Sequence, residues 1–276
     1  MNNALLWLRR EAPGSLVFGL AIALAWVLAA VLAGVITPFD PIKIDVMNAS
    51  LPPSATHLLG TDAVGRDVLA RILYGARMDL IMALAGVAGP FILGTAIGLL
   101  AGYAGGWLDA LLMRILEVTI SFPYFVLVIA IVAIMGPGLK SYIISLTVVN
   151  WVTYARLVRA ETVVLTNADF VLAARVLGYR RRRIMFSHIF PNAIIPSSVF
   201  LMTDAVLTIV LGSSLGFLGL GVQPPTPEWG VMIAEGRTYL GSAWWISVYP
   251  GIALCTLAFG LSLVADGLAK VLDPEA

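Results

Sequence analysis

Residues 168–192 read ADFVLAARVLGYRRRRIMFSHIFPN, and the rest of the chain is best understood from this stretch. It lies between two long apolar runs and joins a short apolar segment to four consecutive arginines. Four of its residues recur at the i, i+3, i+4 and i+7 spacing that places side chains on one face of an α-helix. They are Phe170, Ala173, Ala174 and Leu177.

The ends of this segment are typical of a short helix. Asp169 is a residue type favoured at a helix N-cap, and Gly178 is favoured just beyond a helix C-terminus. A helix between them has only about two turns, and such a helix is marginal in water unless it packs against something. We therefore expect residues 169–178 to have a packing partner, whose identity decides the function.

The composition predicts an all-α integral membrane protein. Apolar residues make up 60% of the 276 residues, charged residues 12%, and the mean hydropathy is +0.95. Soluble proteins are roughly half apolar and a quarter charged, and here the apolar residues come in long runs. The net charge of +1 gives no reason to expect nucleic acid as a partner. With one cysteine and two histidines, neither a disulfide framework nor a metal site is expected.

Six apolar runs predict six transmembrane helices. They cover approximately residues 16–36, 80–103, 110–135, 142–160, 189–211 and 245–265. The first run would be roughly 31 Å long as a helix, which is enough to cross a bilayer. A cleaved signal peptide is the alternative, but its apolar core would be only about 7–15 residues long. We therefore expect an uncleaved anchor.

These runs divide the chain into three parts. Residues 1–79 comprise the anchor helix and a polar segment, residues 80–267 form the transmembrane domain, and residues 268–276 form a polar tail. The pattern of residues 67–78 predicts a short helix on the membrane surface ahead of the second span. Pro123 predicts a kink within the third span.

Glycines in the second run predict close helix packing. Gly94, Gly98 and Gly102 recur at four-residue spacing, and repeated small residues allow another helix to approach closely in lipid. Simple apolar filler is the alternative, because glycine is common in membrane helices.

Two acidic residues are candidates for the interior or for a pathway. Glu117 lies three residues after Arg114 and can pair with it, although near a helix end both side chains can also reach the headgroup layer. Asp204 lies in the middle of the fifth run, where a charge costs about 2.5–3.5 kcal/mol. We expect Asp204 to face the bundle interior, a water path or a partner subunit.

The positive charges predict the orientation. With a cytoplasmic N-terminus, eleven Lys and Arg residues lie on the cytoplasmic side and six on the other, out of seventeen in total. This orientation places both termini and residues 168–192 in the cytoplasm. It places the polar regions after the first and fifth runs outside.

Several motifs in a fixed order resemble one family. They are HLLGTDAVGRDVLARILYGARMDL (57–80), SFPYFVLVI (121–129), AARVLG (173–178), HIFPN (188–192), SSLGFLGLGVQPPTPEWGVMI (213–233) and ADGLAKVLDPEA (265–276). Together they resemble the C-type permease subunit of bacterial dipeptide, oligopeptide and nickel ABC importers. The resemblance extends from about residue 35 to the C-terminus.

The resemblance implies a fold and a set of partners. The fold would be that of a type I ABC importer permease in the bacterial inner membrane, with a cytoplasmic coupling helix between spans 4 and 5. The chain would pair with a homologous B-type permease and with two cytoplasmic ATPase subunits, and a binding protein outside would deliver the solute. No cofactor would be bound by this chain, because the partner ATPases would hold ATP and magnesium.

The coupling helix implied by the resemblance is Asp169 to Gly178, which would dock on the ATPase. Ala173, Ala174 and Gly178 match the family motif, and the implied contact set is completed by Phe170, Arg175 and Leu177.

Two positions depart from the family pattern. Leu172 stands where the wider motif often has glutamate, and Gly212 stands where many relatives have glutamate. Arg180–Arg183 are interpreted as a cluster attracted to anionic lipid, each worth about 1 kcal/mol, with direct ATPase contact as the alternative.

Three alternatives to an ABC importer permease fit the sequence less well. A secondary transporter or channel acting alone would need coupling acids within its spans, and Asp204 and Glu117 are few. A membrane enzyme would need a nucleophile set, a metal cluster or a nucleotide loop, and none is present in the sequence. The amphipathic stretch could also be an interfacial helix without a partner. For the substrate we expect di- or oligopeptides, with nickel chelates or another small solute as the alternative.

Overall fold

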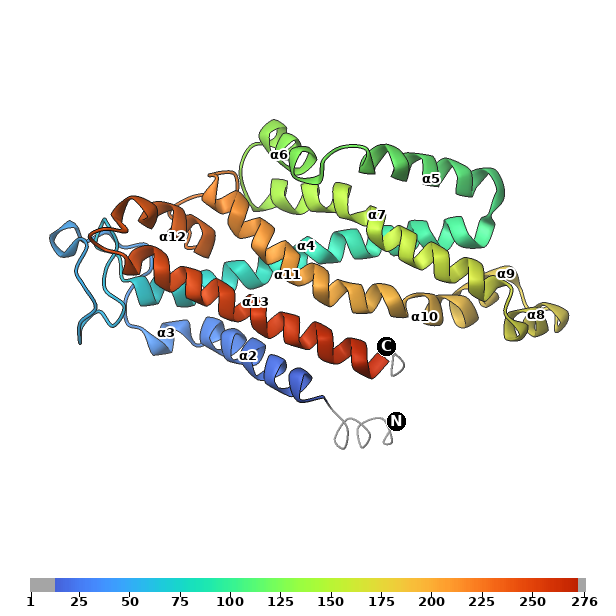
Figure 1. The fold of residues 1–276 in the computed structure, drawn as a ribbon, viewed down its shortest axis with the longest axis horizontal. Helices are drawn as coiled ribbons and strands as arrows, with labels where there is room; N and C mark the ends of the chain where they lie inside the picture. The colour runs from blue at the N-terminus through green and yellow to red at the C-terminus, as the bar shows by residue number, and fades with distance from the viewer. Residues whose placement is uncertain (1–12, 273–276) are drawn as a thin grey trace.

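The structure, a computed structural model, describes residues 13–272 as a bundle of helices that run along the long axis of the molecule (Figure 1). This architecture confirms the all-α fold class. Arg9 and Arg10, which contributed to the predicted orientation, and residues 273–276 of the tail lie outside the described residues. The helices are α2 (Gly14–Val31), α3 (Ala33–Ile36), α4 (Val68–Ala104), α5 (Gly106–Ile120), α6 (Tyr124–Met135), α7 (Leu139–Thr166), α8 (Asp169–Val176), α9 (Arg181–Ile184), α10 (Phe190–Ala193), α11 (Ile195–Phe217), α12 (Trp229–Gly236) and α13 (Trp245–Leu272).

Helices α4 and α7 form the closest helix pair, through glycines on α4. A Cβ added at Gly98 would lie 2.5 Å from the carbonyl oxygen of Ala155, and one at Gly102 would lie 2.8 Å from the Cβ of Thr162. At Gly94 it would meet the carbonyl oxygen of Trp151 at still shorter range. The glycines therefore lie against the backbone of α7, which is the packing that their spacing predicts in lipid.

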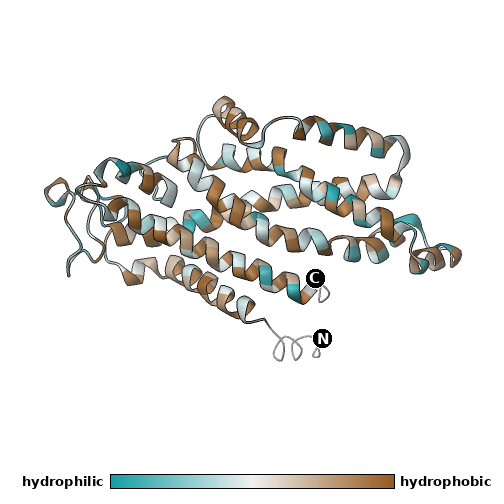
Figure 2. Cartoon of the chain, in the orientation of Figure 1, coloured by the Kyte–Doolittle hydropathy of each residue, from teal (hydrophilic) through white to brown (hydrophobic). Residues whose placement is uncertain are grey.

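Helix α2 lies along α13, also contacts α4, and exposes its outward side (Figure 1). A Cβ at Gly19 would lie 2.7 Å from the carbonyl oxygen of Gly260, so these two helices also touch through glycine. The outward side chains of α2 are apolar and exposed, among them Phe18 and Leu24, and Figure 2 shows the apolar colour along the helix. An exposed apolar helix of this length is favourable in lipid, not in water.

Hydropathy and length identify four or five candidate spans among the described residues. Helices α2, α4, α11 and α13 each qualify alone, and α5 with α6 qualifies as one broken span. Helix α7 has 28 residues but is not among them, because its charged and polar residues, among them the polar Ser145 and Tyr154, lower its hydropathy. Both of these side chains are buried inside the bundle. The count of six spans stays a prediction.

The third predicted span, residues 110–135, is not one helix. The chain breaks at residues 121–123, and α5 and α6 meet at 87°. The predicted kink at Pro123 is therefore a full break, since proline has no N–H to continue the helical hydrogen bonds and here begins a new helix as the N-cap of α6.

Other predicted elements also differ from the structure. The surface helix over 67–78 does not exist as a separate element, because α4 begins at Val68 and continues without a break to Ala104. The fifth run, 189–211, is divided, since a π-helical turn and α10 precede α11, which itself continues to Phe217. The fourth run, 142–160, is part of the longer α7. Helices α4 and α13 run across the expected division points at residues 79 and 267.

The end of the bundle that carries α12 is closed by charged and aromatic contacts. Arg66 donates from Nε to Oδ2 of Asp62 over 2.6 Å, and Arg71 donates from Nη1 to the same oxygen over 2.5 Å. Both arginines also reach Oε2 of Glu235 on α12, at 3.0 and 2.8 Å. Arg71 is almost fully buried, so this network fixes the segment before α4 onto α12.

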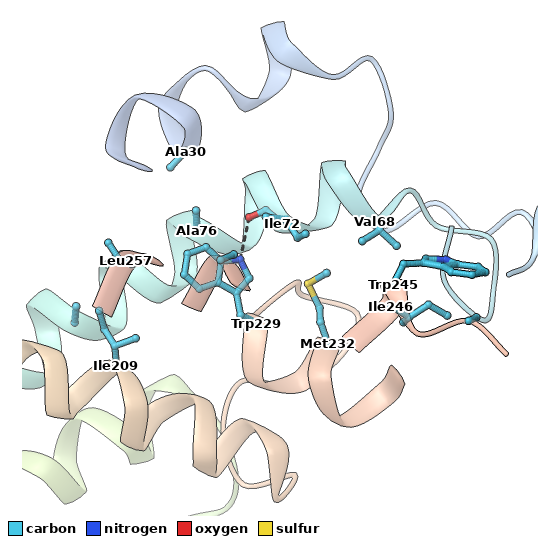
Figure 3. Packing of buried hydrophobic residues seen from close by; sticks show 13 residues of the cluster. Ala30, Val68, Ile72, Ala76, Ile209, Trp229, Met232, Trp245, Ile246 and Leu257 are labelled. Carbon is cyan, nitrogen blue, oxygen red and sulfur yellow. Dashed lines mark hydrogen bonds between the residues drawn. The ribbon is translucent and has the colours of Figure 1, made fainter. Parts of the chain in front are cut away.

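Trp229, the first residue of α12, lies at the centre of the largest apolar cluster (Figure 3). Its indole Nε1 donates to the carbonyl oxygen of Ile72 on α4 over 3.0 Å, and its ring meets Trp26 edge-on with centroids 4.9 Å apart. Leu257 of α13 and Ile209 of α11 belong to the same cluster. The Trp229 side chain thus connects α12 to α4 and α2, within a cluster that also includes α11 and α13.

Candidate functional site

The described structure offers two candidate regions, and they lie in different places. One is α8, which lies at the end of the bundle opposite α12 (Figure 1). The other is a cavity between α5–α6, α7 and α11.

Helix α8 is built as the sequence predicts at its C-terminus, but not at its N-terminus. Gly178 has φ +78°, the left-handed conformation that favours glycine, and its N–H donates to the carbonyl oxygen of Arg175 over 3.0 Å. The next N–H, of Tyr179, donates to Ala174 over 3.1 Å, which completes a Schellman motif. The N-cap is Ala168 and not Asp169, which is the first helical residue and makes no capping hydrogen bond.

The predicted apolar face of α8 is corrected by the structure. Val171 and Ala174 are the buried residues of this helix, and they pack in a cluster with Leu99 of α4 and Val158 of α7. Ala174 therefore does not share an open face with Phe170, Ala173 and Leu177, which are exposed. Two sets of residues on α8 have the spacing of a helix face. The set that includes Val171 faces the bundle, because it packs against the apolar ends of α4 and α7.

The exposed side of α8 presents large apolar side chains. Val176 is 88% exposed and Leu177 is 71% exposed, and Leu172 is exposed as well. Arg175 is exposed beside them, and so are Arg180–Arg183 in the segment that follows. Apolar side chains exposed within such a basic surface are typical of a protein interface, since water disfavours them and the hydrocarbon region disfavours the arginines.

The arginine segment is partly ordered by its own contacts. The guanidinium of Arg183 lies 4.4 Å from the centroid of the Tyr179 ring, a cation–π contact. Ile184, directly after the cluster, is buried in the same group as Val171. The arginines therefore project from a helix turn that is fixed to the bundle.

The second region is a cavity of about 710 Å³ in which Asp204 is the only charged lining residue. Asp204 is 4% exposed and is therefore buried within the described bundle. Its Oδ2 accepts a hydrogen bond from the hydroxyl of Tyr154 at 2.8 Å, and its Oδ1 accepts from the amide of Asn150 at 3.3 Å. The lining residues are Thr119, Ile120, Phe122, Pro123, Tyr124, Phe125, Val149, Asn150, Val152, Thr153, Phe200, Asp204, Leu207, Val210 and Leu211.

Glu117, the other candidate acid, does not line this cavity. Its Oε2 accepts from Nη1 of Arg114 over 2.8 Å, so the predicted pairing is confirmed, and both side chains are exposed on α5. A second pair fixes the start of α5 to α7, because the guanidinium of Arg159 donates to both oxygens of Asp109 over 2.5 and 2.6 Å. This pair connects α5 to α7 and was not predicted.

Two further buried carboxyl groups were also missed by sequence reasoning. Glu228 caps α12 by accepting from the backbone N–H of Gly230 and Val231, and burial raises the pKa of its carboxyl group. Asp79 of α4 accepts from the N–H of Trp229 at 3.3 Å. Asp79 stands at the edge of an apolar run and Glu228 follows three prolines, so each resembled a surface residue in the sequence.

Gly212, where many relatives of the resembled family have glutamate, lies under Tyr142. A Cβ at Gly212 would stand 3.0 Å from the Tyr142 hydroxyl oxygen and would also meet the end of the Met82 side chain. The Tyr142 hydroxyl itself donates to the carbonyl oxygen of Thr208 over 2.7 Å. A longer side chain at this position would have to displace these contacts.

Comparison with known proteins gives one family match and several relatives. Residues 94–276 match the family described as binding-protein-dependent transport system inner membrane component. The chain is 39% identical over 259 residues to the dipeptide transport system permease protein DppC of Alkalihalophilus pseudofirmus, covering 94% of this chain and 85% of the relative. It is 39% identical over 272 residues to the di/tripeptide transport system permease protein DppC of Pseudomonas aeruginosa, with coverages of 96% and 88%.

A third relative has a different named substrate. The chain is 40% identical over 223 residues to the glutathione transport system permease protein GsiD of Pectobacterium atrosepticum, covering 81% of this chain and 74% of the relative.

Solved structures agree on the fold. A chain of the methionine ABC transporter MetNI in an inward-facing conformation superposes with a TM-score of 0.58 at 17% identity, covering 73% of this chain and 96% of that one. A chain of an amino acid ABC transporter gives 0.55 at 16% identity, with coverages of 71% and 91%. The architecture is therefore that of ABC transporter permeases, embedded in a membrane.

Proposed function

We propose that this chain conducts short peptides through one half of a translocation pathway, because it belongs to the family of binding-protein-dependent transport system inner membrane components. The chain is a permease subunit of an ABC importer. Peptides are the substrate class because the relatives named above carry dipeptide, di/tripeptide or glutathione in their names. A nickel chelate or another small solute is the alternative.

The observation that carries this proposal is the exposed side of α8. ATPase docking explains why Val176 and Leu177 are exposed on a helix whose opposite face, through Val171 and Ala174, is packed against the bundle. In this proposal the α8 end is cytoplasmic, together with both termini, and the α12 end faces outward in the bacterial inner membrane. The chain is not catalytic, because ATP and magnesium are bound by two partner ATPase subunits.

The remaining partners follow from the same arrangement. A homologous B-type permease completes the pathway, and an extracytoplasmic solute-binding protein delivers the peptide at the α12 end. Arg180–Arg183 lie beside the docking surface and attract anionic lipid headgroups. Movement of the docked ATPases displaces α8, and α8 transmits that displacement to α4 and α7 through Val171 and Ala174.

The test is reconstitution of the permease pair, the ATPases and the binding protein in proteoliposomes. We expect ATP-dependent uptake of alanyl-alanine and retention of the ATPase when the tagged chain is purified in mild detergent. Leu177→Asp is expected to abolish both ATP-dependent uptake and retention of the ATPase. Met47→Asp changes another highly exposed apolar residue, in the segment before α4 and remote from α8, and should retain the ATPase. Equal retention by wild type and Leu177→Asp would overturn the docking role, and absence of uptake by the wild type would overturn the function.

A further inference from the structure

The role of Asp204 is not explained by packing. Its carboxylate is buried in α11, which is long and apolar enough to span a membrane. None of the ion pairs among the described residues involves Asp204, so no cation within residues 13–272 is paired with its carboxylate. An uncompensated acid in a span is costly, and it persists where it has a function.

The two hydrogen-bond donors to Asp204 orient the carboxylate without neutralising it. Tyr154 and Asn150 are neutral, and each occupies one oxygen. The Tyr154 ring is itself held between Phe91 and Phe200, with ring centroids 5.6 and 5.1 Å apart. A carboxylate accepts about four hydrogen bonds, so these two leave capacity for a further donor.

The space beside Asp204 fits a small peptide. The cavity volume of about 710 Å³ lies in the range of pockets that bind small molecules, roughly 300–1,000 Å³. Its lining is otherwise apolar or neutral, and no Lys, Arg or His is included. The wall contributed by this chain therefore attracts a cationic group and presents no cationic side chain to an anionic one.

We infer that the Asp204 carboxylate is a binding subsite for the primary ammonium group of the transported peptide. The inference rests on the proposed peptide function and assigns one end of the substrate to this chain. The ammonium group would donate to the free capacity of the carboxylate, while apolar side chains such as Leu207 and Phe122 accommodate the rest. A transition metal fits less well, because Asp204 has no second acidic, His or Cys ligand in the lining of this cavity.

The experiment measures binding to the permease complex without the binding protein, so that the selectivity of that protein does not enter. The complex is placed in nanodiscs, and saturation-transfer NMR gives the dissociation constants of two ligands. One is alanyl-alanine, and the other is lactyl-alanine, in which a hydroxyl replaces the ammonium group. We expect lactyl-alanine to bind the wild type more weakly by about tenfold or more.

Asp204→Asn is expected to weaken alanyl-alanine binding by a similar factor and to leave lactyl-alanine unchanged. Glu117→Gln is the matched control, because it makes the same acid-to-amide change on an exposed residue outside the cavity. Its dissociation constants should equal those of the wild type.

These measurements distinguish failure of the Asp204 subsite from failure of the proposed peptide function. Equal binding of the two ligands by the wild type would overturn the subsite even if Asp204→Asn fails to fold. Unchanged alanyl-alanine binding in a folded Asp204→Asn complex would do the same, and so would the absence of any dipeptide binding to the wild type. If the proteoliposomes still take up dipeptide in those cases, only the subsite is lost and the peptide function stands.

Discussion

Gly98 of α4 lies so close to Ala155 of α7 that a Cβ at position 98 would stand 2.5 Å from the Ala155 carbonyl oxygen. No atom at the end of a flexible side chain is involved, so the contact cannot be relieved by a rotamer change. The two helix backbones must separate if position 98 carries any side chain.

We therefore predict that Gly98→Ala destabilises the permease by about 1–3 kcal/mol, the usual cost of overpacking. A thermal melt of the complex in detergent would show a lower midpoint. Gly251→Ala is the control, because Gly251 is also a helical glycine but has no atom within 4 Å of an added Cβ. An equal midpoint for the two variants would show that α4 and α7 do not pack in this way.

The neighbouring residues Ala173 and Ala174 should respond differently to the same change. Ala174 is buried against Leu99 and Val158, so Ala174→Trp should displace α8 and lower the yield of folded protein. Ala173 is exposed, and Ala173→Trp should preserve yield and thermal midpoint while abolishing ATPase retention and uptake. Normal uptake by Ala173→Trp would remove this residue from the docking surface.

A double-mutant cycle at Asp109 and Arg159 tests how the α5–α6 segment is held. The guanidinium of Arg159 donates to both carboxylate oxygens of Asp109, and the pair is partly exposed. Solvent screening reduces the worth of such a pair, so we expect a coupling free energy on the order of 1 kcal/mol. The midpoints of Asp109→Asn, Arg159→Gln and the double variant measure it. Strict additivity of the two losses would contradict a direct interaction.

Removal of the Trp229 side chain should have the largest effect on stability. Trp229→Ala leaves a cavity among four helices and is predicted to cost about 3–5 kcal/mol. Trp229→Phe should cost less, since it retains most of the ring volume and loses chiefly the hydrogen bond to Ile72. Trp107→Ala removes an exposed tryptophan and should stay within about 0.5 kcal/mol of the wild type. A small effect of Trp229→Ala would contradict the central position of this residue.

Hydropathy and length predicted the apolar parts of α2, α4, α11 and α13, because both properties are read from residues close together in the chain. The spacing of Gly94, Gly98 and Gly102 likewise predicted a close helix contact, and α7 is the helix that they meet. These features depend on residues near one another in the chain.

The rest depends on residues distant in sequence. Which stripe of α8 is buried depends on Leu99 and Val158, and the donors to Asp204 lie 50 and 54 residues away from it. Likewise, Pro123 predicts a disrupted helix, but the 87° angle between α5 and α6 depends on how both helices pack on α7. No local pattern contains this information.

Helix α4 has a mechanical consequence. Its 37 continuous residues make a rod of about 55 Å at 1.5 Å per residue, whereas the hydrocarbon core of a bilayer is about 30 Å thick. Near one end, the carbonyl oxygen of Ile72 accepts the hydrogen bond from Trp229. Near the other end, Leu99 packs in the cluster that includes the buried residues of α8. Both contacts lie on one continuous helix, so a tilt of α4 at the α8 end reaches the seat of α12 through a single element. Pro90 lies between the two contacts and has no N–H to donate, so it is the point at which α4 can bend and absorb part of that tilt.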